Sequence, residues 1–60
     1  MEARQAIVGV RTTEGWLFRA MQDGMLFTVR GNVSLVDAKR TIEPQLDHEY
    51  GRKGWFWYNH

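Results

Sequence analysis

The sequence has no cysteine, a single proline and only two histidines among its 60 residues. Without cysteine, the chain cannot build a disulfide framework, a thiolate zinc site or a thiol nucleophile. The histidines, His48 and His60, are too few and too far apart in the chain to hold a metal without other ligands. We therefore expect no cofactor, and a reducing compartment, the cytoplasm, is the predicted location.

Long apolar runs and signal-peptide patterns are also missing. The longest apolar stretch, residues 6–10, is far too short to span a bilayer, and the N-terminus lacks a charged segment followed by an apolar one. The formal net charge is +1, so overall charge does not indicate nucleic acid. The length allows one soluble domain, residues 1–60, whose small core needs tight aromatic packing or self-association for stability.

Alternating polar and apolar residues predict three antiparallel strands, at about residues 5–12, 16–22 and 25–30. Asp23 and Gly24 predict a two-residue hairpin loop between the second and third strands, since type I′ turns favour this pair. This register places Trp16, Phe18, Ala20, Met25, Phe27 and Val29 on one face. That face is the expected side of the core.

The first hairpin loop is less well defined by its residues. A two-residue loop at Glu14 and Gly15 would set Val10 against Arg19 and leave Val8 and Val10 on the wrong face. A three-residue loop, residues 13–15, sets Val10 opposite Phe18 and restores a single apolar face. Because a slip of one residue reverses every side chain of a strand, we expect the three-residue loop.

The second half of the chain predicts one helix, at about residues 35–43. Ser34 is a suitable N-cap, and Leu35, Ala38 and Ile42 recur at helical spacing to form an apolar stripe. Pro44 disfavours helical geometry at the residue before it, so we expect the helix to stop or kink there, at about residue 43. A turn over residues 44–50 then follows.

The chain ends in an aromatic tail, residues 54–58, which favours a short fourth strand running parallel to the third. The predicted fold is therefore α+β, with a three-stranded antiparallel meander packed on one C-terminal helix. The sheet face opposite the helix would be open to solvent. On this face we expect three converging guanidinium groups and a row of apolar side chains.

Two binding hypotheses follow from this open face. Arginine on an exposed sheet suits phosphate or guanine edges, and aromatic side chains beside basic residues can stack on bases. The predicted DNA contacts are Arg11, Arg19, Thr28, Arg30, Arg52 and Lys53. The alternative is an inhibitor or adaptor, of the kind that phages and mobile elements encode, which binds a host protein. Its predicted interface is Ile7, Leu17, Met21, Leu26, Trp55, Trp57 and Tyr58. A homodimer through the predicted apolar row of Ile7, Met21 and Leu26, or through the tail, is a third hypothesis.

Short motifs over residues 8–43 support the first hypothesis. They are Gly9-Val10-Arg11 in the first strand, Gly15-Trp16 at the second, and Gly31, Ser34, Asp37-Ala38 and Ile42-Glu43 leading into the helix. With these motifs the chain resembles the DNA-binding domain of plant ethylene-response factors and the arm-binding domains of tyrosine integrases. The resemblance implies that the open sheet face enters the major groove, with Arg11, Arg19 and Arg30 as DNA contacts.

Catalytic patterns are missing. The only serine, Ser34, is explained as an N-cap, and His48 lies between two acidic residues that point away from it along the chain. No glycine-rich phosphate loop precedes the helix. A pocket of about 300 Å³ for a small-molecule substrate would take most of so small a core. We therefore expect a binding module and not an enzyme.

Overall fold

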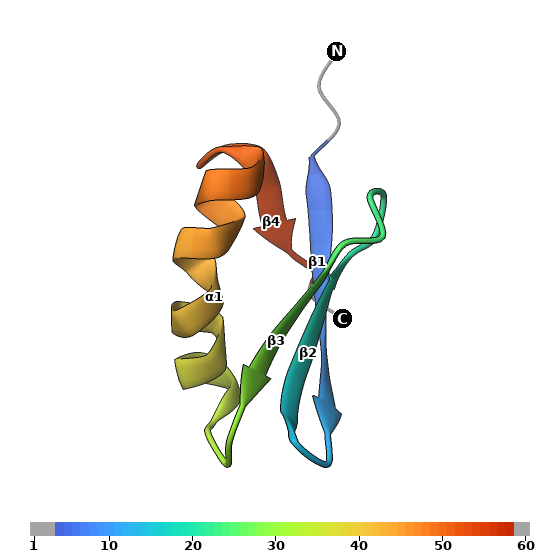
Figure 1. Cartoon of the computed structure of the whole chain (residues 1–60). Helices are drawn as coiled ribbons and strands as arrows, with labels where there is room; N and C mark the ends of the chain where they lie inside the picture. Colours follow the sequence, from blue (N-terminus) through green and yellow to red (C-terminus); the bar gives the residue numbers. More distant parts are fainter. Residues whose placement is uncertain (1–3, 59–60) are drawn as a thin grey trace.

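The computed structural model describes residues 4–58, which form one mixed sheet and one helix. The elements are β1 (Gln5–Thr12), β2 (Gly15–Ala20), β3 (Leu26–Arg30), α1 (Leu35–Tyr50) and β4 (Trp55–Trp57). The strand order in the sheet is β3-β2-β1-β4. α1 lies along one side of the sheet, and no described element covers the other side (Figure 1). The predicted α+β class, with an antiparallel meander, a C-terminal helix and a short fourth strand, is confirmed.

The connection between β2 and β3 is longer than the predicted two-residue turn. The N–H of Ala20 donates to the carbonyl of Met25 at 2.9 Å, so residues 21–24 form the loop. Tertiary contacts of Asp23 favour this longer loop. Its N–H donates to the Gln5 side chain at 3.1 Å, and its carboxylate accepts the Tyr50 hydroxyl at 2.7 Å.

This longer loop shifts the pairing by two residues, so that Phe18 faces Phe27 across the ladder. A shift of two residues preserves the side on which each side chain lies. Phe18 and Phe27 are therefore buried towards α1, as predicted, while Arg19 and Thr28 are exposed on the opposite face. The predicted faces of β2 and β3 are correct although the register is not.

The predicted face of β1 is wrong. Thr12 pairs with Gly15, so the first loop has two residues and Ile7 lies opposite Ala20. Ile7 is consequently fully buried, and the outward positions belong to Val8 and Val10.

Packing around Phe18 explains this register. Gly9 lies opposite Phe18, and a Cβ built at Gly9 would approach the Phe18 ring to 2.7 Å. The ring therefore fills the space that the glycine leaves. In the predicted register a valine would occupy this space and displace the ring from the core.

The helix continues through Pro44 to Tyr50, so the predicted end at residue 43 is also wrong. Ser34 caps its first turn by accepting the N–H of Asp37, as expected. A proline inside a helix costs about 3 kcal/mol. Stopping at residue 43 would expose Leu46, whereas the longer helix buries both Ile42 and Leu46 completely. Burial of this apolar stripe outweighs the cost of the proline.

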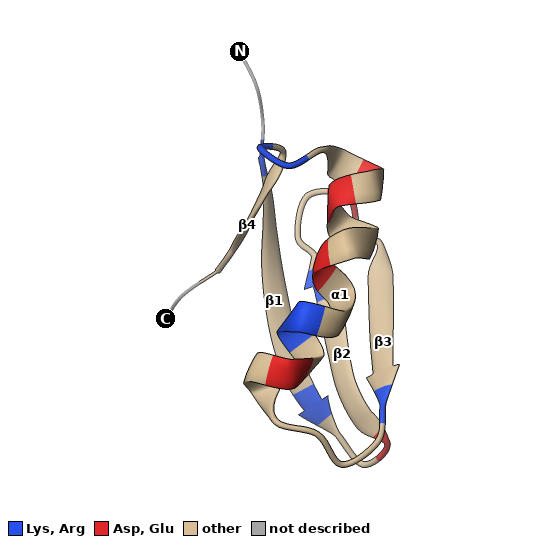
Figure 2. Ribbon diagram, turned by 90° about the vertical axis from the view of Figure 1, so that its left-hand side faces the viewer, with Lys and Arg blue, Asp and Glu red and all other residues tan. Residues whose placement is uncertain are grey.

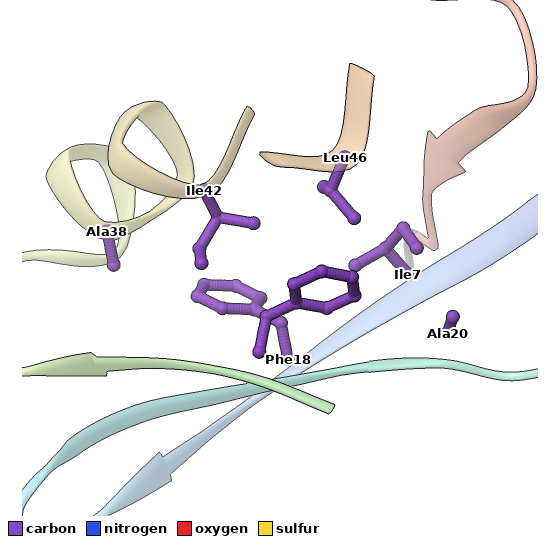
Figure 3. Close-up of a cluster of buried hydrophobic side chains, with 7 residues drawn as sticks. Ile7, Phe18, Ala20, Ala38, Ile42 and Leu46 are labelled. Carbon is purple, nitrogen blue, oxygen red and sulfur yellow. The ribbon is translucent and has the colours of Figure 1, made fainter. Parts of the chain in front are cut away.

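The core lies between α1 and the sheet. Figure 3 shows side chains from the helix pointing towards side chains from the strands. The core residues are Ile7, Phe18, Ala20, Phe27, Ala38, Ile42 and Leu46. β4 runs in the same direction as β3, as predicted, but its hydrogen-bonded neighbour is β1 at the far edge of the sheet.

Candidate functional site

The sheet face opposite α1, here called the outer face, carries an apolar band across all four strands. Because side chains alternate along a strand, the residues next to each core position point to this face. Val10 and Leu26 are 54% and 56% exposed, although both lie within regular strands. The apolar band comprises Val8 and Val10 of β1, Leu17 of β2, Leu26 of β3 and Phe56 of β4. Met21, which follows β2 at the loop of residues 21–24, and Tyr58, which follows β4, are exposed large side chains next to it.

Three arginines interrupt or flank the apolar band. Arg19 lies in one cross-strand row between Val8 and Leu26. The guanidinium of Arg4 lies 4.7 Å from the centre of the Phe56 ring, within cation–π range. Arg30 ends β3, and its guanidinium is 4.0 Å from the Glu14 carboxylate. Because the Arg30 and Glu14 side chains are 85% and 76% exposed, solvent screens this pair and it contributes little.

Charge is distributed unevenly between the two layers of the fold. None of the four strands contains an aspartate or glutamate. The helix carries both acidic and basic residues, whereas the charged residues of the strands and of the approach to β4 are all basic (Figure 2). The outer face is therefore apolar and positively charged.

A shallow hollow of about 280 Å³ opens at the end of the outer face where Arg30 lies. Leu17, Thr28 and Arg30 are among the residues that line it. Gly15 lies in the cross-strand row beside Arg30 with φ +149°, and a Cβ there would collide with the carbonyl oxygen of Val29. No other residue type fits this position, so β2 has no side chain between Thr12 and Arg30 in this row.

The predicted DNA contacts do not all converge. Arg19, Thr28 and Arg30 share the outer face, but Arg11 lies on the helix side, where its guanidinium stacks 5.2 Å from the Trp16 ring. The cause is the one-residue error in the register of β1. The remaining contacts, Arg52 and Lys53, lie in the turn before β4. With about 3.3 Å per strand residue, that turn is roughly 20 Å from the end of the sheet that carries Arg30.

The predicted protein interface is also redistributed. Ile7 belongs to the core, and Trp55 and Trp57 lie on the helix side of β4, where both are half-buried. The indole N–H of Trp55 donates to Asp47 at 2.8 Å, and the Trp57 ring lies 5.6 Å from Phe18. These residues stabilise the fold. The exposed or half-exposed members of the predicted interface are Leu17, Met21, Leu26 and Tyr58.

Sequence reasoning missed Val8, Val10, Phe56 and Arg4 as members of the outer face. The signal for Phe56 was available, since its two tryptophan neighbours must share the opposite side of any strand. For the valines the signal was Gly9, whose lack of a side chain marks a close approach by another group.

The loop that precedes Leu26 is fixed to the helix through Tyr50. Desolvation by burial, followed by the hydrogen bond and the negative charge of Asp23, raises the pKa of Tyr50 to about 12. The hydroxyl is therefore a neutral donor at physiological pH. This contact holds the loop of residues 21–24 against α1, next to Leu26 of the apolar band.

Within residues 4–58, no three histidine or acidic side chains cluster closely enough to hold a metal ion. The same part of the chain contains no helix with the length and apolar character needed to cross a membrane. Comparison with protein-family models, curated proteins and solved structures found no match to this chain.

Proposed function

We propose that this chain is a non-catalytic protein-binding module that docks on its partner through the outer face. The observation that supports the proposal is the apolar band, which crosses all four strands without a covering element in the described chain. Small soluble domains rarely leave a contiguous apolar surface without a binding role. Arginine, tyrosine, phenylalanine and methionine, which flank or belong to the band, are enriched at protein interfaces.

The energetics support docking on a protein. Complete burial of a valine, leucine or phenylalanine side chain contributes roughly 1.5–3 kcal/mol. Val10, Leu26 and Phe56 are each more than a third exposed, so a partner could bury substantial further surface on all of them. Several such residues are needed because association itself costs roughly 4–15 kcal/mol.

DNA binding is the competing function, and the shared position of Arg19, Thr28 and Arg30 supports it. A DNA-binding sheet reads base edges with polar side chains and neutralises phosphates with cations. Here valine and leucine occupy the central outward positions of β1 and β2, where such side chains would be needed. The apolar band therefore favours a protein partner.

The test compares three aspartate variants. Val10→Asp and Leu26→Asp place a charge in the apolar band, whereas Val36→Asp does so on the exposed surface of α1, where Val36 is 60% exposed. Each protein is immobilised and used to capture partners from an extract of the source cells. We expect one dominant protein to be captured by the wild type and Val36→Asp but lost from the other two.

A parallel mobility-shift assay with random duplex DNA distinguishes the competing function. DNA binding requires an affinity that falls steeply with salt and that depends on Arg19 and Arg30. Retention of DNA by Val10→Asp and Leu26→Asp, with loss in Arg19→Ala and Arg30→Ala, would replace the protein-binding proposal by the nucleic-acid one.

A further inference from the structure

The open edge of β3 offers a contact made by backbone groups and not by side chains. In an antiparallel pair, alternate residues direct both N–H and C=O towards the neighbouring strand. The bonds from Ala20 to Met25 and from Gly31 to Glu14 fix this alternation, so Phe27 and Val29 pair with β2. Leu26, Thr28 and Arg30 consequently direct their N–H and C=O groups to the open edge. No hydrogen bond from another residue in the range 4–58 reaches these groups.

This edge has little protection against pairing. Natural edge strands are commonly shielded by proline, lysine or a bulge, and β3 (LFTVR) contains neither proline nor lysine and pairs continuously with β2. The other edge, β4, has only three residues, two of them tryptophans. β3 is therefore the edge on which a further strand can be added.

A hollow lies beside this edge on the helix side. It has a volume of about 310 Å³ and is lined by Phe27, Pro44, Gln45, His48 and Glu49. An apolar cavity of about 150 Å³ can hold a benzene molecule, so this open hollow has room for an aliphatic side chain. A strand added to β3 would direct every second side chain towards it.

The charge on the outer face indicates which side chains an added strand would present on that side of the sheet. Side chains of an added strand would lie next to Leu26, Thr28 and Arg30, with Arg19 in the row that contains Leu26. The strands supply no carboxylate for these guanidinium groups, and the contact of Arg30 with Glu14 is exposed. An acidic residue on the added strand would complement them.

We propose that β3 binds an extended acidic segment of a partner protein as a fifth strand, with apolar side chains at the Phe27–Pro44 hollow and carboxylates beside Arg30. Addition of a strand to a sheet edge provides affinity through main-chain hydrogen bonds and specificity through alternate side chains. The inference rests on the proposed function in that the partner is a protein. It depends on the backbone groups of the β3 edge, however, and Val10 of the outer face lies two strands away from this edge.

The probe is a displayed library of random peptides, each about twelve residues long, selected on the immobilised protein. The selected sequences should alternate apolar with acidic residues. A synthetic peptide with one selected sequence is then titrated against variants of β3. Thr28→Pro removes one edge N–H, and Thr28→Val keeps it. We expect at least about a tenfold weaker affinity for Thr28→Pro and a change below about twofold for Thr28→Val, since the proline removes one edge hydrogen bond and its ring also blocks the approach of the added strand.

A charge-reversal pair tests the acidic character. Arg30→Glu should weaken binding of the selected peptide at least tenfold, whereas Arg40→Glu, at an exposed position of α1, should leave it unchanged. Selected sequences without acidic residues, or equal sensitivity to both variants, would overturn this part of the inference.

Amide hydrogen exchange of the wild-type protein tests the edge even if Thr28→Pro does not fold. The amides of Leu26, Thr28 and Arg30 should exchange at least tenfold more slowly when the peptide is bound, while those of Phe27 and Val29 are already slow in the free protein. Unchanged edge amides would overturn the inference. Slow exchange caused by raising the protein concentration without peptide would replace the partner segment by a second copy of the chain.

The two proposals can fail separately. A selected peptide that is lost in Val10→Asp but retained in Thr28→Pro binds the outer face, which supports the proposed function and overturns the fifth strand. The opposite pattern supports the fifth strand and leaves the outer face without evidence of binding.

Discussion

Adjacent residues in β1 provide the most decisive test of the register. Ile7 is fully buried under α1, and Val8 points to the outer face and is half-buried. Truncation of a buried isoleucine to alanine costs about 2–5 kcal/mol, because it removes apolar contacts and leaves a cavity. Val8→Ala removes about two methylene equivalents, worth roughly 0.8 kcal/mol each when fully buried, so a half-buried site loses about 0.8 kcal/mol.

These costs must be compared with the total stability. A chain of 60 residues is expected to have an unfolding free energy of roughly 3–9 kcal/mol. In a domain of this size, 1 kcal/mol changes Tm by about 4–8 °C. We therefore expect Ile7→Ala to lower Tm by at least about 8 °C or to prevent folding, and Val8→Ala to lower it by about 3–6 °C.

Thermal unfolding followed by circular dichroism and by tryptophan fluorescence measures both variants. The matched control is the wild type under the same conditions, with both probes required to report one transition. A larger loss of stability in Val8→Ala than in Ile7→Ala would refute the register, and with it the composition of the outer face.

Three further predictions concern the loop, the helix and pH. Gly15→Ala should lower the unfolding free energy by more than Gly24→Ala, in urea titrations, because both have positive φ but only Gly15 would place its Cβ against the Val29 carbonyl. Pro44→Ala should raise the unfolding free energy by up to about 3 kcal/mol, since it restores a helix N–H at an exposed position; no gain would mean that the helix is already relaxed around the proline. The pKa of Tyr50 is about 12 in the folded chain and about 10 when unfolded, so the fold favours the neutral phenol, and its contribution is complete below pH 10 and is lost as the pH rises towards 12. The difference in unfolding free energy between the wild type and Tyr50→Phe should therefore shrink between pH 10 and 12, and a constant difference would contradict the Asp23 contact.

Local patterns were sufficient for most of the fold. Alternation identified the buried faces of β2 and β3 correctly. The predicted pairing of these strands was wrong by two residues, which changes the partner of each residue but not the face on which its side chain lies. Ser34 marked the helix start correctly for the reason expected, since its side chain accepts the N–H of Asp37. In these segments local preference and tertiary packing agree.

Two features depended on tertiary contacts that the sequence does not express locally. Hydrophobicity favours Val8 and Val10 over Ile7 and Gly9 as the buried residues of β1. The Phe18 ring, however, occupies the space that a side chain at position 9 would fill. Pro44 is a local signal for a helix end, yet complete burial of Leu46 after it provides the larger free energy. Both errors arose where packing overrides a local preference.

The candidate site was predicted only in part for the same reason. Arg19, Thr28 and Leu26 were assigned to the open face correctly, since they belong to strands whose sides were identified. Arg11 and Ile7 were not, because the slip in β1 exchanged the two faces of that strand. The apolar band is consequently more continuous, and the arginine cluster smaller, than the sequence alone predicted.

Site-specific photo-crosslinking tests the central claim, that a protein partner docks on the outer face. A photoreactive phenylalanine analogue is introduced at Val10 in one protein and at Val36, on the exposed surface of α1, in another. Both are irradiated in an extract of the source cells and analysed for covalent adducts. The account predicts one dominant protein adduct from position 10 and none from position 36. Adducts from position 36 alone, or from both positions equally, would contradict it.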